Sequence, residues 1–170
     1  APEASVADCA RAMSEARISC LVIRNGARLE GIITERDMVC YLDRRLAPET
    51  RVCDVMSTPV VTAPVTMDIR AAWELLPGNG VRHLVVVDAT GQVAGVASET
   101  DFRIHLGLEL MRQSHELVAV TETALQTFSP EDSLAVAVAH MAAVARDHVI
   151  VLEDGRAAGI LTERDVPALL

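Results

Sequence analysis

A hydroxyl residue followed three positions later by an aspartate recurs three times at a constant interval. This spacing suits a nucleotide, because a hydroxyl at the start of a helix can donate to a phosphate beside the free backbone N–H groups and the positive end of the helix dipole. A carboxylate one turn further on repels phosphate but can accept hydrogen bonds from the two hydroxyls of a ribose. The pairs are Thr34 and Asp37, Ser98 and Asp101, and Thr162 and Asp165, and successive pairs lie 64 positions apart, from 34 to 98 and from 98 to 162.

The same side chains can also form a helix cap without any ligand. In a capping box, the hydroxyl of the first residue accepts from the backbone N–H three residues on, and the carboxylate reaches back to the N–H of the first residue. Each such cap stabilises a helix by about 1 kcal/mol. The pattern alone therefore leaves a nucleotide site and a purely structural cap both open.

Each pair lies inside a repeated octet that begins with glycine. The octets are Gly31–Met38, Gly95–Phe102 and Gly159–Val166. A glycine three residues before the cap lets a ligand or a partner strand approach the backbone closely. The first and third octets add a cation beside the cap, Arg36 and Arg164, where the middle octet has a threonine. A unit copied at a fixed period is typical of a repeat architecture.

The residues around the middle octet predict one β-α-β-β-α unit. Asp68 is expected to cap an amphipathic helix, and the run Pro77–Gly80 is expected to end it. The continuous β-branched run at 84–87 is typical of a buried strand. The expected elements are strands at 60–62, 84–87 and 92–97, a helix at 69–76 and a closing helix from 98.

The other two copies follow the same order. In the third, we expect a strand at 125–128, a helix at 134–145 and strands at 148–152 and 156–161. The first begins with a helix capped by Ser5 that reaches about residue 15, and its strands at 21–23 and 29–33 flank an Asn-Gly hairpin turn. The first copy therefore lacks the strand that opens the other two.

Composition limits the kind of protein. Hydrophobic residues make up 51% of the chain and aromatic residues only 2%, so the core must consist of small aliphatic side chains. The net charge of −9 argues against sequence-independent binding to nucleic acid or anionic lipid. No apolar run approaches the roughly 20 residues of a membrane-spanning helix, and no secretory signal is visible, so we expect a cytoplasmic protein without membrane insertion. We expect its cysteines to be reduced and mostly buried, namely Cys9, Cys20, Cys40 and Cys53.

The pattern Gly-hydrophobic-x-[Ser/Thr]-x-x-Asp at the end of a β-α-β-β-α unit resembles the cystathionine-β-synthase (CBS) domain. All three copies match, and the lead-in from Asp54 to Thr62 also resembles the opening of that family. The resemblance implies an α+β fold (α/β-type) of tandem CBS repeats, with small mixed sheets packed with helices and paired as a Bateman module. We expect repeats at 1–47, 52–110 and 117–170, with the first two forming the pair and the third awaiting a partner.

The resemblance also implies binding clefts for an adenosine-containing ligand such as AMP, ADP, ATP or S-adenosylmethionine. It places the hydroxyl residue near the phosphate and the aspartate on the ribose. Two departures from the family pattern are Asp147, which would disfavour phosphate in the third cleft, and Pro167, which would bend the last helix. By position, the second site comprises Thr62, Val81, Arg82, His83, Ser98 and Asp101; the third Thr127, Asp147, His148, Thr162, Arg164 and Asp165; and the first Ile18, Ser19, Cys20, Thr34, Arg36 and Asp37.

These implications predict a regulatory module in which nucleotide binding shifts an attached output. No Ser-His-Asp or Cys-His arrangement recurs with usable spacing, so we expect neither an enzyme, nor a catalytic cofactor, nor a metal site. The connector at 107–117 resembles those of bacterial CBS arrays fused to cyclic-di-GMP enzymes or histidine kinases, which implies a fused or partner signalling domain. A homodimer is the expected assembly. Two alternatives stay open: a non-binding dimerisation module, and the regulatory part of a metabolic enzyme or ion transporter.

Overall fold

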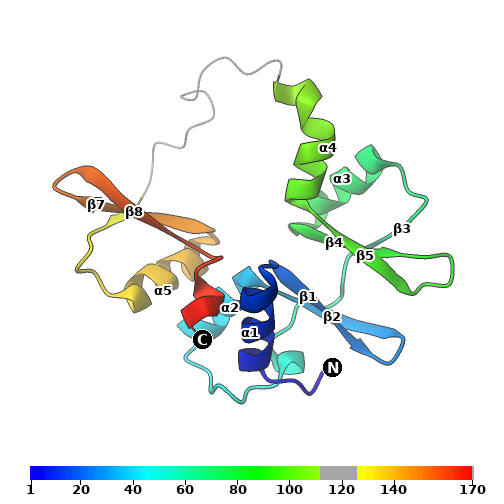
Figure 1. Ribbon diagram of the computed structural model, residues 1–170, viewed down its shortest axis with the longest axis horizontal. Helices are drawn as coiled ribbons and strands as arrows, with labels where there is room; N and C mark the ends of the chain where they lie inside the picture. The colour runs from blue at the N-terminus through cyan, green and yellow to red at the C-terminus, as the bar shows by residue number, and fades with distance from the viewer. Residues whose placement is uncertain (112–125, 170) are drawn as a thin grey trace. The chain divides into compact units, whose positions relative to one another are not determined.

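The described residues, 1–111 and 126–169 of this computed structural model, fall into two units (Figure 1). One unit contains residues 1–23, 31–57 and 126–169, which are most of the first repeat and the third repeat. The other contains residues 24–30 and 58–111, which are the tip of the first hairpin and the second repeat. Each unit has its own hydrophobic cluster.

The second repeat shows the predicted β-α-β-β-α order without interruption. Its sheet has the strand order β3-β4-β5, with β3 parallel to β4 and β4 antiparallel to β5. A small cluster that includes Ala63, Leu76 and Leu84 fills the space between sheet and helices, and the rings of Trp73 and Phe102 lie 5.8 Å apart. The elements are β3 (Thr62–Pro64), α3 (Ile69–Asn79), β4 (His83–Val87), β5 (Val93–Ser98) and α4 (Glu99–Met111).

The third repeat has the same strand order and directions, β6-β7-β8. Its elements are β6 (Thr127–Phe128), α5 (Leu134–Val144), β7 (His148–Glu153), β8 (Arg156–Thr162) and the 3-10 helix η3 (Val166–Leu169). The first repeat consists of α1 (Val6–Ala16), β1 (Cys20–Asn25), β2 (Arg28–Thr34) and α2 (Glu35–Asp43), followed by the 3-10 helix η1 (Val52–Asp54). Within this sequence, α1 is the first element of the first repeat.

The first and third repeats share one hydrophobic core, so the expectation that the third repeat awaits a partner is wrong. Helix α2 packs against α5, and α1 packs against η3 (Figure 1). Met38, Met141 and Val166 are each almost fully buried in this common cluster. Burial of such side chains stabilises the fold by roughly 1.5–3 kcal/mol each, which a solvated helix face would not provide. The pairing of the first and second repeats stays a prediction.

Two prolines act differently on their helices. The helix α3 was expected to end at the run Pro77–Gly80, but it continues through Pro77 and stops only at Gly80, which has φ 65°. A proline near the end of a helix already has the helical φ and removes one hydrogen bond only, so the helix can pass through it. Pro167 was expected to bend the last helix; instead, a short 3-10 helix stands where the first repeat has the α-helix α2.

Two expectations from the sequence concern membrane-spanning helices and cysteines. In the described part of the chain, no helix combines the length and the apolar character needed to cross a bilayer. All four cysteines are free; Cys9 is buried, whereas the other three are half-buried, so the expectation of mostly buried thiols holds only in part.

Candidate functional site

Each octet joins the end of a strand to the start of a helix or turn, and its hydroxyl and carboxylate form a local cap. In the first octet, one carboxylate oxygen of Asp37 accepts from the backbone N–H and the hydroxyl of Thr34, both at 2.7 Å, and Asp37 N–H donates back at 3.4 Å. The second octet repeats these contacts between Ser98 and Asp101 at 2.8, 2.6 and 3.3 Å. In the third, Asp165 accepts from the N–H and hydroxyl of Thr162, both at 2.8 Å. The predicted helix cap is therefore present in the first two octets, whereas in the third Asp165 N–H donates to the carbonyl of Thr162 at 3.0 Å and the 3-10 helix begins only at Val166.

The second carboxylate oxygen distinguishes the first repeat from the other two. Asp37 Oδ1 accepts a hydrogen bond from the hydroxyl of Ser57 at 3.0 Å, so both oxygens of that carboxylate are engaged. In Asp101 and Asp165, only Oδ2 is engaged by residues within 1–111 and 126–169. Their Oδ1 atoms can therefore accept hydrogen bonds from another molecule.

The charge state of Asp101 suits such an acceptor. The hydroxyl of Ser98 lowers the pKa of this carboxyl, the backbone N–H of Ser98 adds to the effect, and partial desolvation opposes it. His105 and His83 lower this pKa further. Since the pKa lies below its ordinary value, Asp101 is ionised at neutral pH and is an acceptor only.

A repeated backbone hydrogen bond brings the predicted neighbours to each octet. The N–H after each cap residue donates to a carbonyl before the middle strand: Glu35 to Ser19 at 3.1 Å, Glu99 to Arg82 at 2.8 Å, and Glu163 to Asp147 at 2.8 Å. His83 lies opposite Ser98 in the strand register, and His148 lies opposite Thr162. These contacts bring Ser19, Arg82, Asp147 and the two histidines next to the caps.

Other predicted residues lie further from the caps or face the core. Val81 packs against the cluster of the second unit instead of lining the site. Thr62 and Thr127 lie on the opening strands, opposite Val85 and Ile150 rather than opposite the histidines. Ile18 is exposed.

Cys20, another predicted residue of the first site, is half-buried. Burial, with the nearby charge of Glu35 as the smaller cause, raises the pKa of its thiol to about 11. The side chain is therefore a neutral thiol at neutral pH.

The two predicted arginines contact the facing repeat rather than their own caps. Arg36 Nε lies 3.5 Å from Glu163 Oε1, and Arg164 Nε lies 3.7 Å from Glu35 Oε1. Glu163 is only 3% exposed. The Glu-Arg dipeptides of the first and third octets thus exchange ion pairs across the shared core.

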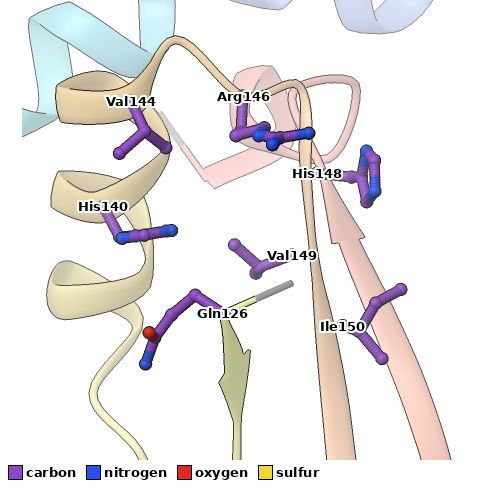
Figure 2. A pocket seen from close by; sticks show the side chains of 7 residues that line it. All are labelled: Gln126, His140, Val144, Arg146, His148, Val149 and Ile150. Carbon is purple, nitrogen blue, oxygen red and sulfur yellow. The ribbon is translucent and has the colours of Figure 1, made fainter. Parts of the chain in front are cut away.

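A cavity of about 290 Å³ lies between α5 and β7 of the third repeat. Figure 2 shows His140 and Val144 projecting from α5 toward Val149, whereas His148 and Ile150 lie on the other side of β7. Of the lining residues only His148 was predicted, although His140 and Val144 have the four-residue spacing of one helix face. The lining residues are Gln126, His140, Val144, Arg146, His148, Val149 and Ile150. Within the described ranges, no group of three His, Cys, Asp or Glu side chains is placed to hold a metal ion.

Comparisons with known proteins agree with this architecture. The CBS domain protein PAE2072 from Pyrobaculum aerophilum, solved in complex with AMP, is 25% identical with a TM-score of 0.58, covering 65% of this chain and 88% of that one. Protein MJ1225 from Methanocaldococcus jannaschii, described as an archaeal homologue of γ-AMPK, has a TM-score of 0.84 over 99% of this chain and 66% of that one. At 21% identity, this second likeness supports the fold alone.

The sequence relatives include an enzyme of which this chain resembles a small part. Inosine-5'-monophosphate dehydrogenase from Thermoplasma acidophilum is 31% identical over 100 residues, which are 59% of this chain but 20% of the enzyme. The match to protein MK0525 from Methanopyrus kandleri covers 48% of that protein, so the chain spans about half or less of these two relatives. The family model described as CBS domain matches residues 1–44, 52–107 and 109–167. With three consecutive matches that together cover most of its length, this chain belongs to the CBS-domain family.

Proposed function

We propose that this chain is a regulatory module that binds an adenosine-containing nucleotide beside the octets of its second and third repeats. The proposal rests above all on the open Oδ1 atoms of Asp101 and Asp165, each next to a capping hydroxyl. An ionised carboxylate in this position can accept from a ribose hydroxyl while its other oxygen keeps the backbone cap.

The capping hydroxyl supplies the second half of the site. In the second repeat, the Ser98 hydroxyl donates to Asp101 at 2.6 Å, and the backbone N–H of Ser98 holds the same oxygen at 2.8 Å. The Ser98 hydroxyl can instead donate its hydrogen bond to a phosphate oxygen, because the bond from the Ser98 backbone N–H still orients Asp101. The likeness to PAE2072, which was solved with AMP, supports an adenosine ligand.

The side-chain charges beside the caps predict which repeat binds a phosphate most tightly. The second repeat places Arg82 next to its cap, and a guanidinium cation there favours a phosphate. The third has Asp147, whose carboxylate lies 2.7 Å from His148 Nδ1, and this negative charge weakens phosphate binding. In the first, both carboxylate oxygens of Asp37 are already engaged by Thr34 and Ser57. We therefore place the tightest site in the second repeat.

A metabolic enzyme regulated through its CBS repeats is the second candidate context, and the match to the dehydrogenase supports it. The alternative output, a cyclic-di-GMP enzyme or histidine kinase, rests on the connector at 107–117, of which residues 112–117 lie outside the described residues. The fused output, the homodimer and the cytoplasmic location stay predictions.

A thermal-shift panel with AMP, ADP, ATP and S-adenosylmethionine tests nucleotide binding. A ligand at 100 times its Kd adds roughly 2.7 kcal/mol to the free energy of unfolding, so the melting temperature should rise by several degrees. The matched variants are Asp101→Ala and Asp132→Ala, because Asp132 accepts from Ser129 N–H at 2.7 Å in the same three-residue spacing but outside any octet. We expect Asp101→Ala to lose most of the shift and Asp132→Ala to keep it. No shift with any of the four compounds, or an undiminished shift in an Asp101→Ala, Asp165→Ala double variant, would reject the proposal.

A further inference from the structure

The lead-in to the second repeat covers the edge of the first repeat's sheet. The backbone of Ser57 exchanges hydrogen bonds with Ile32 of β2, at 2.8 and 3.1 Å. The side chain of the preceding Met56 fills the notch above Gly31, where a Cβ would collide with the methionine sulfur. The Ser57 hydroxyl then donates to Asp37. Three successive contacts therefore fix one extended segment on one strand edge.

The third repeat has the same acceptor surface, and no segment among residues 1–111 and 126–169 covers it. Six of the seven residues from Gly159 to Asp165 are identical to those from Gly31 to Asp37. Yet Ile160 is 56% exposed, whereas the equivalent Ile32 is 7% exposed. Nothing lies within 4 Å of a Cβ built on Gly159. Asp165 Oδ1 has no donor among the residues that the structure describes. All three contact points of the first repeat are thus available in the third.

Neither local backbone geometry nor local packing requires glycine at position 159. Its φ lies outside the left-handed region, so the β-bulge opposite Val151 and Leu152 does not demand it. A glycine inside a strand costs about 0.5–1 kcal/mol relative to alanine and often marks a place where another chain approaches closely. In the first repeat, that approaching side chain is Met56.

The strand β8 also lacks the usual protection of an exposed edge. It is the last strand in the order β6-β7-β8, and its residues from Arg156 to Ile160 are all exposed. Natural sheet edges are usually blocked by proline, lysine, inward-pointing charges or a covering element. Here Ala157, Ala158 and Gly159 leave the backbone accessible.

We propose that β8 is a docking edge for an extended polypeptide segment with the chemistry of Val55-Met56-Ser57. Its methionine would sit above Gly159, its backbone would pair with Ile160, and the hydroxyl of its next residue, serine or threonine, would donate to Asp165 Oδ1. Main-chain pairing with a sheet edge supplies affinity in such complexes, and the side-chain notch supplies specificity. The second repeat is a poorer acceptor, because Val96 and Ala97 replace the larger residues of the other two octets. The segment and a nucleotide would compete for Asp165 Oδ1, so this inference does not rest on nucleotide binding and is tested without nucleotide.

The test is a nucleotide-free titration of a fluorescently labelled peptide, Asp-Val-Met-Ser-Thr, which copies residues 54–58, with the full chain. We expect saturable binding, followed by fluorescence anisotropy. The variant Gly159→Ala should weaken it roughly tenfold or more, because its Cβ occupies the methionine notch. The control Gly78→Ala also adds a Cβ in open space but lies on α3, and it should bind as the wild type does.

Two further variants sharpen the test. A peptide in which glycine replaces methionine should bind more weakly, and Asp165→Ala should also weaken binding. Equal affinity for Gly159→Ala and the wild type would overturn the proposal. So would a loss of binding in Gly95→Ala instead, or the absence of saturable binding at roughly millimolar concentrations.

Discussion

One acceptor atom separates repeats that look alike in sequence. Every octet has its hydroxyl and its aspartate three residues apart, and in every octet the hydroxyl donates to the aspartate. Within the described part of the chain, the remaining aspartate oxygen is engaged only in the first octet, by Ser57, a residue 20 positions away. The caps could be predicted because they depend on local spacing, whereas the Ser57 contact depends on where the chain returns after α2.

The thiol of Cys20 gives a prediction at the same scale. Its pKa of about 11 lies above the ordinary 9.0, so folding favours the neutral thiol. The associated stability is fully present below pH 9 and is lost as the pH rises through 11. At pH 8, we expect Cys20 in the folded protein to react with iodoacetamide roughly a hundredfold more slowly than in urea, because the thiolate fraction falls by that factor. Mass spectrometry of the alkylated peptides measures this, and equal rates in both states would contradict the buried, neutral thiol.

Three helices end in the same way at equivalent positions of the repeats. The helices α1, α3 and α5 stop at residues in the left-handed region: Arg17 with φ 54°, Gly80 with φ 65° and Ala145 with φ 53°. Only glycine adopts this conformation without a steric penalty. The glycine of the second repeat was visible as a stop signal, but the equivalent stops at Arg17 and Ala145 carry no such signal in the sequence.

A reciprocal pair of substitutions tests these helix ends. We expect Ala145→Gly to raise, and Gly80→Ala to lower, the free energy of unfolding by about 0.5–1 kcal/mol each. The control Gly78→Ala lies inside α3 in open space and should stabilise the protein by a similar amount. Urea denaturation measures all three. Stabilisation by both Gly80→Ala and Gly78→Ala would show that α3 does not end where the structure places its cap.

The β-α-β-β-α order could be predicted because strand and helix periodicity is local. The opening strand of the third repeat was expected at 125–128, and β6 covers Thr127–Phe128 of it. Position 125 lies outside the described residues. The continuation of α3 through Pro77 was missed because proline signals a break without saying how much of the last helical turn survives it.

The largest difference from expectation concerns the whole chain. The first and third repeats share a core, and Arg36 and Glu163, which exchange an ion pair there, are 127 positions apart. No periodicity encodes which copies pack together, because every copy has a similar apolar helix face. The Glu-Arg dipeptides of both octets were visible in the sequence, but their function as partners becomes clear only once α2 lies against α5.

Substitutions in these two ion pairs should change the free energy of unfolding by different amounts. Glu163→Gln removes a nearly buried carboxylate facing Arg36, and we expect it to lower the free energy of unfolding by about 1–3 kcal/mol. Arg164→Gln removes the other pair, in which the arginine side chain is 82% exposed, and should change it by less than about 0.5 kcal/mol. Urea denaturation of both variants is the measurement. A larger loss for Arg164→Gln would contradict the assignment of Glu163 as the buried partner.

Calorimetric titration of AMP into Asp37→Ala and Asp101→Ala tests the central claim most directly, since both variants remove the same cap carboxylate from equivalent octets. If an open aspartate oxygen defines the nucleotide site, Asp101→Ala abolishes the tightest binding event and Asp37→Ala leaves it intact. Loss of that event in Asp37→Ala, with Asp101→Ala binding as the wild type does, would contradict the claim.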